Sequence, residues 1–150
     1  MLRGMFKKQF VNGHTTHVPY VRVGMFANDR VSPEVEGVID TGASINLIAM
    51  TAGRTMLGKS REEIRNGKPL KIDGVGAASL AFGWKVDLRL RATAAADKYM
   101  LLKDVWVYFV ETRLPHGDVL VGQFTGLEER VLVHKNCESE RFWMLQDSKA

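Results

Sequence analysis

The chain has 150 residues, 45% of them hydrophobic and 25% charged, which is the size and composition of one soluble globular domain. Its net charge is +4, but the lysines and arginines are scattered, so we expect no nucleic-acid partner. No apolar run approaches the roughly 20 residues of a membrane span, and the N-terminal residues lack the apolar core of a signal peptide. With Cys137 as the only cysteine, these features predict a cytoplasmic protein without a membrane partner.

Residues 1–16 show no clear periodicity and are interpreted as an N-terminal extension, followed by one domain over residues 17–150. Residues 18–26 are β-branched and aromatic, which predicts a strand. Residues 28–30 have turn composition. Residues 35–40 then predict a returning strand that forms a hairpin with the first.

A short apolar run at residues 45–48 precedes a predicted helix at 50–57, which Gly58 would end. Ser60 and Glu63 have the spacing of a capping box, which predicts a further helical turn. Asn66 and Gly67 instead indicate a hairpin. The sequence leaves these two local alternatives open.

The rest of the chain predicts short strands and little helix. Predicted strands at 70–72 and 81–90 flank a glycine-containing stretch. Those at 131–133 and 142–145 would form a hairpin around Lys135 and Asn136. One helical turn is predicted at 127–130. The predicted strands lie at 70–72, 81–90, 105–110, 119–121, 131–133 and 142–145. The fold class is therefore all-β or nearly so.

One motif has the composition of a catalytic site. Asp40 ends an apolar strand and is followed by Thr41, Gly42, Ala43 and Ser44. Gly42 lets the backbone turn where a side chain would obstruct it. The hydroxyls of Thr41 and Ser44 can hydrogen-bond neighbouring backbone groups. The pattern therefore predicts a carboxylate held in a tight turn at the end of a buried strand.

The sequence here resembles the retropepsin-like (retroviral-type) aspartic peptidases. Residues 40–44 match the active-site motif of that family, and two further elements follow in the same order. The first is similar to the family's flap and consists of Asp73, Gly74, Val75 and Gly76. The second is similar to its second apolar-apolar-glycine element and consists of Leu120, Val121 and Gly122. Gly122 is expected to allow two backbones to pack closely beside the active-site loop.

Two positions depart from the pattern of that family. Gln123 and Phe124 stand where the family usually has Arg-Asp or Arg-Asn, and Ser44 stands where the retroviral members have an acidic residue. The arginine–carboxylate pair near the site is therefore missing at both ends.

The resemblance implies a single-lobe closed β-barrel with one or two short helices. It also implies an endopeptidase that needs two carboxylates. Because the chain has a single Asp-Thr-Gly, we expect a twofold homodimer in which each subunit contributes Asp40, with a protein or peptide as substrate. No metal or organic cofactor is expected. The alternative is a catalytically weak or inactive dimeric β domain used for peptide binding or assembly.

Other candidate residues have simpler interpretations. His14 and His17 have His-x-x-His spacing but no further ligands in a recognisable pattern. Cys137 lies in a polar segment and is expected to be an exposed or half-exposed thiol. The three tryptophans, Trp84, Trp106 and Trp143, lie in apolar segments and are expected in a core or an interface.

Overall fold

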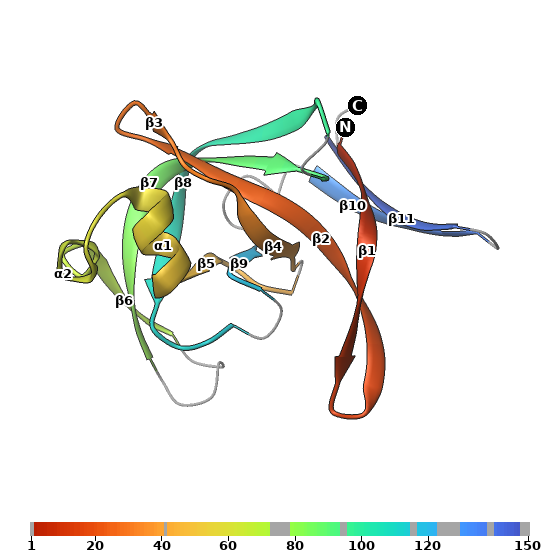
Figure 1. Cartoon of the computed structure of the whole chain (residues 1–150), viewed down its shortest axis with the longest axis horizontal. Coiled ribbons are helices and arrows are strands. Elements are labelled where there is room, and N and C mark those ends of the chain that lie inside the picture. The colour runs from red at the N-terminus through yellow and green to blue at the C-terminus, as the bar shows by residue number, and fades with distance from the viewer. Residues whose placement is uncertain are drawn as a thin grey trace.

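The structure, a computed structural model, describes residues 2–40, 42–72, 79–93, 96–114, 117–122, 130–137 and 140–147. Most of these residues lie in strands, and two short helices accompany them (Figure 1). The elements are β1 (Leu2–Val11), β2 (His14–Ala27), β3 (Arg30–Val31), β4 (Val35–Ile39), β5 (Asn46–Ala49), α1 (Met50–Leu57), α2 (Arg61–Ile64), β6 (Lys68–Ile72), β7 (Ser79–Arg91), β8 (Tyr99–Val110), β9 (Val119–Val121), β10 (Arg130–Cys137) and β11 (Glu140–Asp147). The expected all-β class is confirmed.

Strand pairing closes a ring that runs from β2 through β4, β9, β5, β8 and β7 back to β2. Within it, β4 and β9 are parallel, while β9 and β5 are antiparallel. Alternate residues of β2, namely Val21, Val23 and Met25, point into the ring and are buried. The main core therefore lies inside the ring.

The predicted pairing of residues 18–26 with 35–40 is confirmed, since β2 and β4 are antiparallel from Tyr20↔Val38 to Val23↔Val35. The predicted turn between them is also present. Asn28 and Asp29 both have positive φ angles, 52° and 59°, and they connect β2 to β3. Positive φ at two central residues is the geometry of the tight hairpin turn that Asn and Asp favour.

The helical predictions are confirmed as well. Helix α1 ends at Gly58, whose φ of 68° is left-handed, and Ser60 and Glu63 form the capping box at the start of α2. The hairpin alternative at Asn66 and Gly67 is wrong. The N–H groups of Asn66 and Gly67 donate to the carbonyls of Glu63 and Ile64, the last two residues of α2. The chain then enters β6, which pairs with β7.

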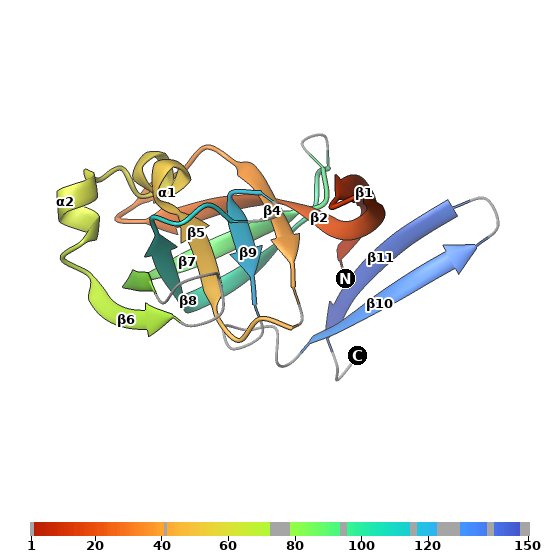
Figure 2. The same cartoon turned by 90° about the horizontal axis from the view of Figure 1, so that it is seen from below.

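The two ends of the chain pair with each other. Strand β1 lies between β2 and β11, and β11 pairs with β10 (Figures 1 and 2). The expected N-terminal extension, residues 1–16, thus contains β1 and the start of β2, and the domain division at that point stays a prediction. The expected terminal hairpin of residues 131–133 with 142–145 is confirmed, since β10 and β11 are antiparallel. Its turn does not lie at Lys135 and Asn136, because both belong to β10 and the strands pair as far as Cys137↔Glu140.

No helix among the described ranges is both long and apolar enough to cross a membrane.

Candidate active site

The candidate site lies where two parallel strands end. Asp40 directly follows β4, and Gly122 directly follows β9. The two strands are in register from Gly37↔Val119 to Ile39↔Val121. The backbone N–H of Asp40 donates a 2.9 Å hydrogen bond to the carbonyl oxygen of Val121. The parallel pairing therefore brings Asp40 and the predicted apolar-glycine element together, although they are far apart in the sequence.

The loop after β4 holds the carboxylate of Asp40. The N–H of Gly42 donates to Oδ1 of Asp40 at 2.9 Å, and the N–H of Ala43 donates to the Asp40 carbonyl at 3.1 Å. A hydrogen bond from a backbone N–H to the aspartate side chain two residues earlier defines an Asx turn, which aspartate favours. Asp40 is half-buried, while Gly42 and Ser44 are exposed. Thr41 lies outside the described residues.

Gly122 packs directly against this loop. A Cβ atom at this position would overlap the carbonyl oxygen of Ile45 and lie 2.9 Å from that of Ala43. Both obstacles are backbone atoms, which cannot rotate away as a side chain can. The expectation that Gly122 allows two backbones to pack closely is thus confirmed, and no side chain fits here without moving the loop.

Asn46 is a site residue that sequence reasoning missed. Its side chain is 0% exposed at the start of β5. Its Oδ1 accepts a 2.9 Å hydrogen bond from the N–H of Gly122, and its Nδ2 donates to the carbonyl of Trp106 at 3.2 Å. The amide thereby connects the end of β9 and the start of β5 to the interior of β8. The available signal was one polar residue inside the apolar run at 45–48.

A second apolar cluster, separate from the main core, adjoins the Asp40 loop. Ala43 and Ile45 of the loop pack against it. Its buried members are Leu47, Ile72, Ala81, Val110, Leu114 and Leu120. Leu120 faces this cluster and Val121 faces the main core, as alternate residues of a strand do. The loop after Asp40 is therefore packed on an apolar cluster through Ala43 and Ile45.

The predicted flap residues Asp73, Gly74, Val75 and Gly76 lie outside the described residues. The strands on either side of them, β6 and β7, are antiparallel and pair up to Ile72↔Ser79. Ile72 belongs to the second apolar cluster together with Leu120. The base of this hairpin and the end of β9 therefore contact the same cluster beside Asp40. Among the described residues, no group of His, Cys, Asp and Glu could hold a metal ion.

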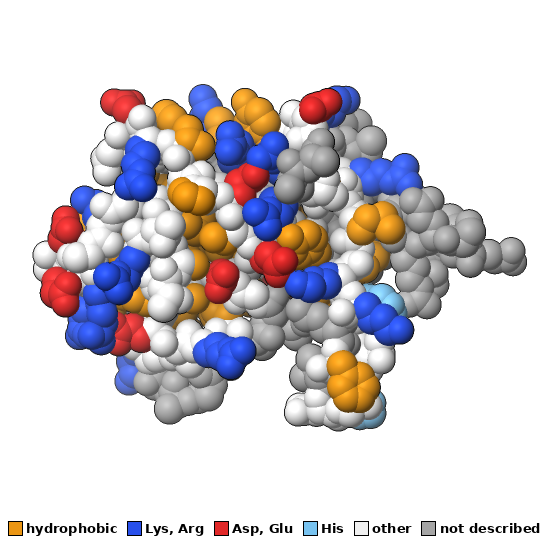
Figure 3. Space-filling view, in the orientation of Figure 1, with side chains coloured by type: hydrophobic (Ala, Val, Ile, Leu, Met, Phe, Trp, Pro, Cys, Tyr) orange, Lys and Arg blue, Asp and Glu red, His pale blue; other side chains and the backbone are white. Residues whose placement is uncertain are grey.

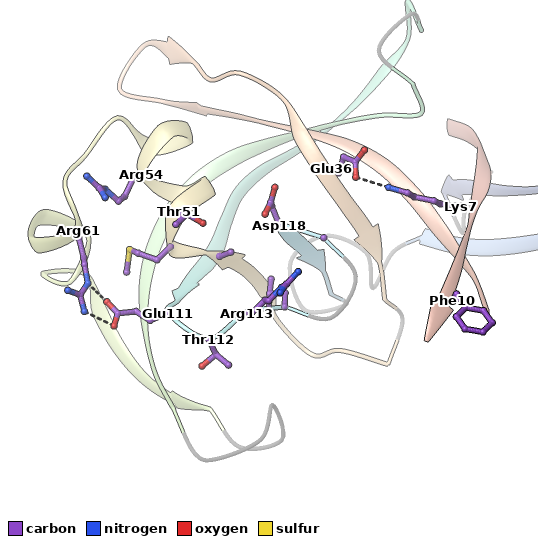
Figure 4. Close-up of a pocket in the computed structure, with 14 residues that line it drawn as sticks. Lys7, Phe10, Glu36, Thr51, Arg54, Arg61, Glu111, Thr112, Arg113 and Asp118 are labelled. Carbon is purple, nitrogen blue, oxygen red and sulfur yellow. Dashed lines mark hydrogen bonds and ion pairs between the residues drawn. The ribbon is translucent and has the colours of Figure 1, made fainter. Parts of the chain in front are cut away.

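A hollow of about 940 Å³ lies at the starts of β4 and β9, whereas Asp40 and Gly122 follow their ends (Figure 4). Glu36 and Asp118 line it, and the Asp40 loop does not. Glu36 and Asp40 are four residues apart on an extended chain, or roughly 13 Å. The size of this hollow therefore does not mark the candidate site.

Two ion pairs border the hollow. Lys7 Nζ lies 2.9 Å from Glu36 Oε2, and Arg61 Nη2 lies 2.7 Å from Glu111 Oε2. The hydrogen bond from Lys7 lowers the pKa of Glu36, and the bond from Arg61 lowers the pKa of Glu111. These carboxylates are held ionised by their partners, so they are structural charges rather than candidate proton donors.

Comparisons with known proteins agree with this topology. No protein-family model matches the sequence, and no curated protein does either. Among solved structures, the chain is similar to a retropepsin-like aspartic protease from Rickettsia conorii, with a TM-score of 0.52 and 15% sequence identity. The match covers 94% of this chain and 90% of that one. The chain therefore has a retropepsin-like fold.

Proposed function

We propose that the chain is an aspartic endopeptidase that acts as a twofold homodimer, with Asp40 of each subunit forming a catalytic pair. The observation that carries the proposal is the placement of Asp40. It ends a buried strand, its carboxylate accepts the N–H of Gly42, and its backbone is anchored on Val121. This arrangement occurs in a retropepsin-like fold.

The proposed chemistry explains why two subunits are needed. Peptide hydrolysis of this kind uses one carboxylate as a base toward a water molecule and a second, protonated carboxyl that polarises the scissile carbonyl. Like charges held close together cannot both be ionised, so the pair shares one proton. The sequence has a single Asp-Thr-Gly motif. A twofold axis beside Asp40 supplies the second carboxylate without a second motif.

The surroundings of Asp40 support a peptide as substrate. A peptide would bind in extended conformation across the twofold axis, beside the Asp40 loops. The second apolar cluster, which includes Leu47 and Leu120, lies beside the loop. We therefore expect a preference for apolar side chains next to the cleaved bond.

The experiment compares cleavage of a peptide library by the wild type and by Asp40→Asn. The asparagine oxygen can still accept the N–H of Gly42, so the variant should keep the loop and the fold, as circular dichroism would check. Cleavage by the wild type that is lost in Asp40→Asn is the expected result. An Asn variant that still cleaves would overturn the proposal.

The alternative of a catalytically weak or inactive dimeric β domain is motivated by Gln123 and Phe124, which stand where the family usually has Arg-Asp or Arg-Asn. Peptides that bind to the wild type and to Asp40→Asn, and that neither protein cleaves, would favour this alternative.

A further inference from the structure

A second surface with the character of a binding site lies on the outward face of β2, β7 and β8. Phe26, Arg89 and Leu101 share this face, since Arg89 pairs with Gly24 and Leu101, and Phe26 lies two residues beyond Gly24. These strands surround a hollow of about 350 Å³. Figure 3 shows hydrophobic side chains among lysines and arginines along the upper edge of the molecule, where these strands run in Figure 1. We call this surface the β2–β7–β8 face and define it by Phe26, Val31, Arg89, Tyr99, Leu101 and Lys103.

The apolar side chains of this face are unusually exposed. Phe26 is 42% exposed, Val31 is 52% exposed and Tyr99 is 58% exposed, and all three line the same hollow. Single exposed hydrophobic residues are ordinary, whereas several around one hollow indicate a contact surface. The volume is at the small end of the range for ligand pockets and suits one or two side chains.

The charge around the hollow is positive on balance, since Arg89 and Lys103 line it together with one carboxylate, Asp87. The guanidinium of Arg89 lies 5.6 Å from the centre of the Tyr99 ring, and its buried Nε has no hydrogen-bond partner. Asp87 also lines the hollow, but its Oδ1 accepts the backbone N–H of Asp104 at 2.8 Å instead of a hydrogen bond from Arg89. Within the described part of the chain, neither Arg89 nor Lys103 has a carboxylate partner.

A neighbouring arginine shows what a compensated cation looks like here. Arg91 lies on the same side of β7, and its Nε and Nη2 both donate hydrogen bonds to the carboxylate of Glu34. Arg89 has no such bidentate partner, although its guanidinium lies over Gly24. A Cβ atom placed on Gly24 would be 3.5 Å from Nε of Arg89. A cation placed by packing and left without an anion is prepared for a carboxylate from outside.

We propose that the β2–β7–β8 face is a docking site for an acidic peptide segment of a partner protein. An apolar side chain of that segment enters the hollow between Phe26, Val31 and Tyr99, and a neighbouring carboxylate pairs with Arg89 and Lys103. A peptide fits better than a nucleic acid, since the hollow is largely apolar and only two cations, Arg89 and Lys103, line it. Phosphate backbones are bound by longer tracks of positive charge.

This site is separate from the candidate active site. Along β2, Tyr20 pairs with Val38 close to Asp40, whereas Phe26 lies six residues further on, or roughly 20 Å away. The proposal therefore does not depend on the proposed peptidase function. In a peptidase, a segment bound here would be held outside the catalytic cleft.

The test measures fluorescence polarisation of a labelled peptide in which one leucine is flanked by two aspartates on each side. The protein is the full chain with Asp40→Asn, so that the probe is not cleaved. We expect Arg89→Gln, Lys103→Gln and Phe26→Ser each to weaken binding, by about tenfold for Arg89→Gln. The matched control is Arg54→Gln on α1, another exposed cation without a described partner, which should bind as the parent does. Binding should also weaken with added salt.

Probe variants identify the chemistry that is recognised. Replacing the leucine by serine, or the aspartates by lysines, should weaken binding at least tenfold. The three variants change exposed or half-buried side chains, and thermal unfolding would check that they are folded. The proposal is wrong if Arg89→Gln and Phe26→Ser bind the probe like the parent, or if no binding is measured. It is also wrong if single-stranded oligothymidylate binds more tightly and displaces the peptide, because the ligand would then be nucleic acid.

Discussion

The backbone N–H of Gly122 donates a 2.9 Å hydrogen bond to Oδ1 of Asn46, whose side chain is completely buried. This bond joins the end of β9 to the start of β5, and Asp40 hydrogen-bonds the adjacent Val121. The position of the catalytic candidate thus depends on an amide that does not itself contact the carboxylate. Asn46 is a positioning residue in this arrangement.

Replacing Asn46 by leucine should destabilise the fold. The substitution keeps the branched shape of the side chain but leaves the N–H of Gly122 and the carbonyl of Trp106 without their partner. Each unsatisfied buried group costs about 1–3 kcal/mol, so for the two groups we expect a loss of about 2–6 kcal/mol in the free energy of unfolding. Urea denaturation measures it. A loss below 0.5 kcal/mol would show that water replaces the amide.

The Asn46→Asp variant gives a matched comparison with a pH signature. An ionised carboxylate can accept from Gly122 but cannot donate to the carbonyl of Trp106. A protonated carboxyl can do both. The stability difference between this variant and the wild type should therefore shrink as the pH falls toward 4. A difference that does not change with pH would contradict the two-bond role of Asn46.

Gly122→Ala tests the close packing of the two backbones. The added Cβ overlaps the carbonyl oxygen of Ile45, which is part of the main chain. We expect a loss of about 3 kcal/mol or more in the free energy of unfolding, measured by urea denaturation. Gly13→Ala is the control, because no atom lies within 4 Å of that Cβ position and only its left-handed backbone, with φ of 80°, is strained. That control should lose only about 1 kcal/mol.

The ion pair between Lys7 and Glu36 should make a small, pH-dependent contribution to stability. The pKa of Glu36 is lowered from 4.5, so its contribution is present above pH 4.5 and is lost as the pH falls through the lowered value. The pKa of Lys7 is raised from 10.5, so its contribution is intact below pH 10.5 and is lost as the pH rises through the raised value. The pair therefore stabilises the chain between these limits.

Lys7→Met removes the charge and keeps the apolar stem. Both partners are nearly half-exposed, so solvent screening limits the expected loss at pH 7 to about 0.2–1 kcal/mol. Thermal unfolding at pH 7 and pH 3 measures the difference from the wild type, which should be smaller at the lower pH. Lys8→Met is the control, since Lys8 is exposed on the same strand. An equal loss in both variants would argue against a specific pair with Glu36.

Much of the fold follows from local signals in the sequence. Gly58 and the Ser60–Glu63 pair determine where α1 ends and α2 begins, because left-handed backbone and capping bonds are properties of neighbouring residues. The absence of a hairpin turn at Asn66 and Gly67, by contrast, depends on a residue far away in the sequence. The indole N–H of Trp84 donates to the carbonyl of Ile64, which stabilises the end of α2 from a distant strand.

Long-range pairing was the part that residue patterns could not determine. Asp40 is recognisable from its own motif, but nothing in the apolar run at 45–48 shows that Asn46 meets Gly122 and Trp106. The misplaced turn at Lys135 has a similar cause. Turn composition there is overridden because β10 continues to pair with β11, which is itself held by β1.

The proposed dimer makes a prediction that mixing experiments can check. If each catalytic pair needs Asp40 from two subunits, a subunit with Asp40→Asn inactivates any wild-type partner, since an amide cannot share the proton. A tenfold excess of Asp40→Asn, refolded together with a fixed amount of wild type, leaves roughly one in eleven wild-type subunits with a wild-type partner. Peptide cleavage should then fall about tenfold. The same excess of Arg54→Gln, an active subunit with one surface charge removed, should instead increase cleavage. Activity that is unchanged by excess Asp40→Asn would show that one subunit cleaves alone, and the proposed pair of Asp40 side chains would be wrong.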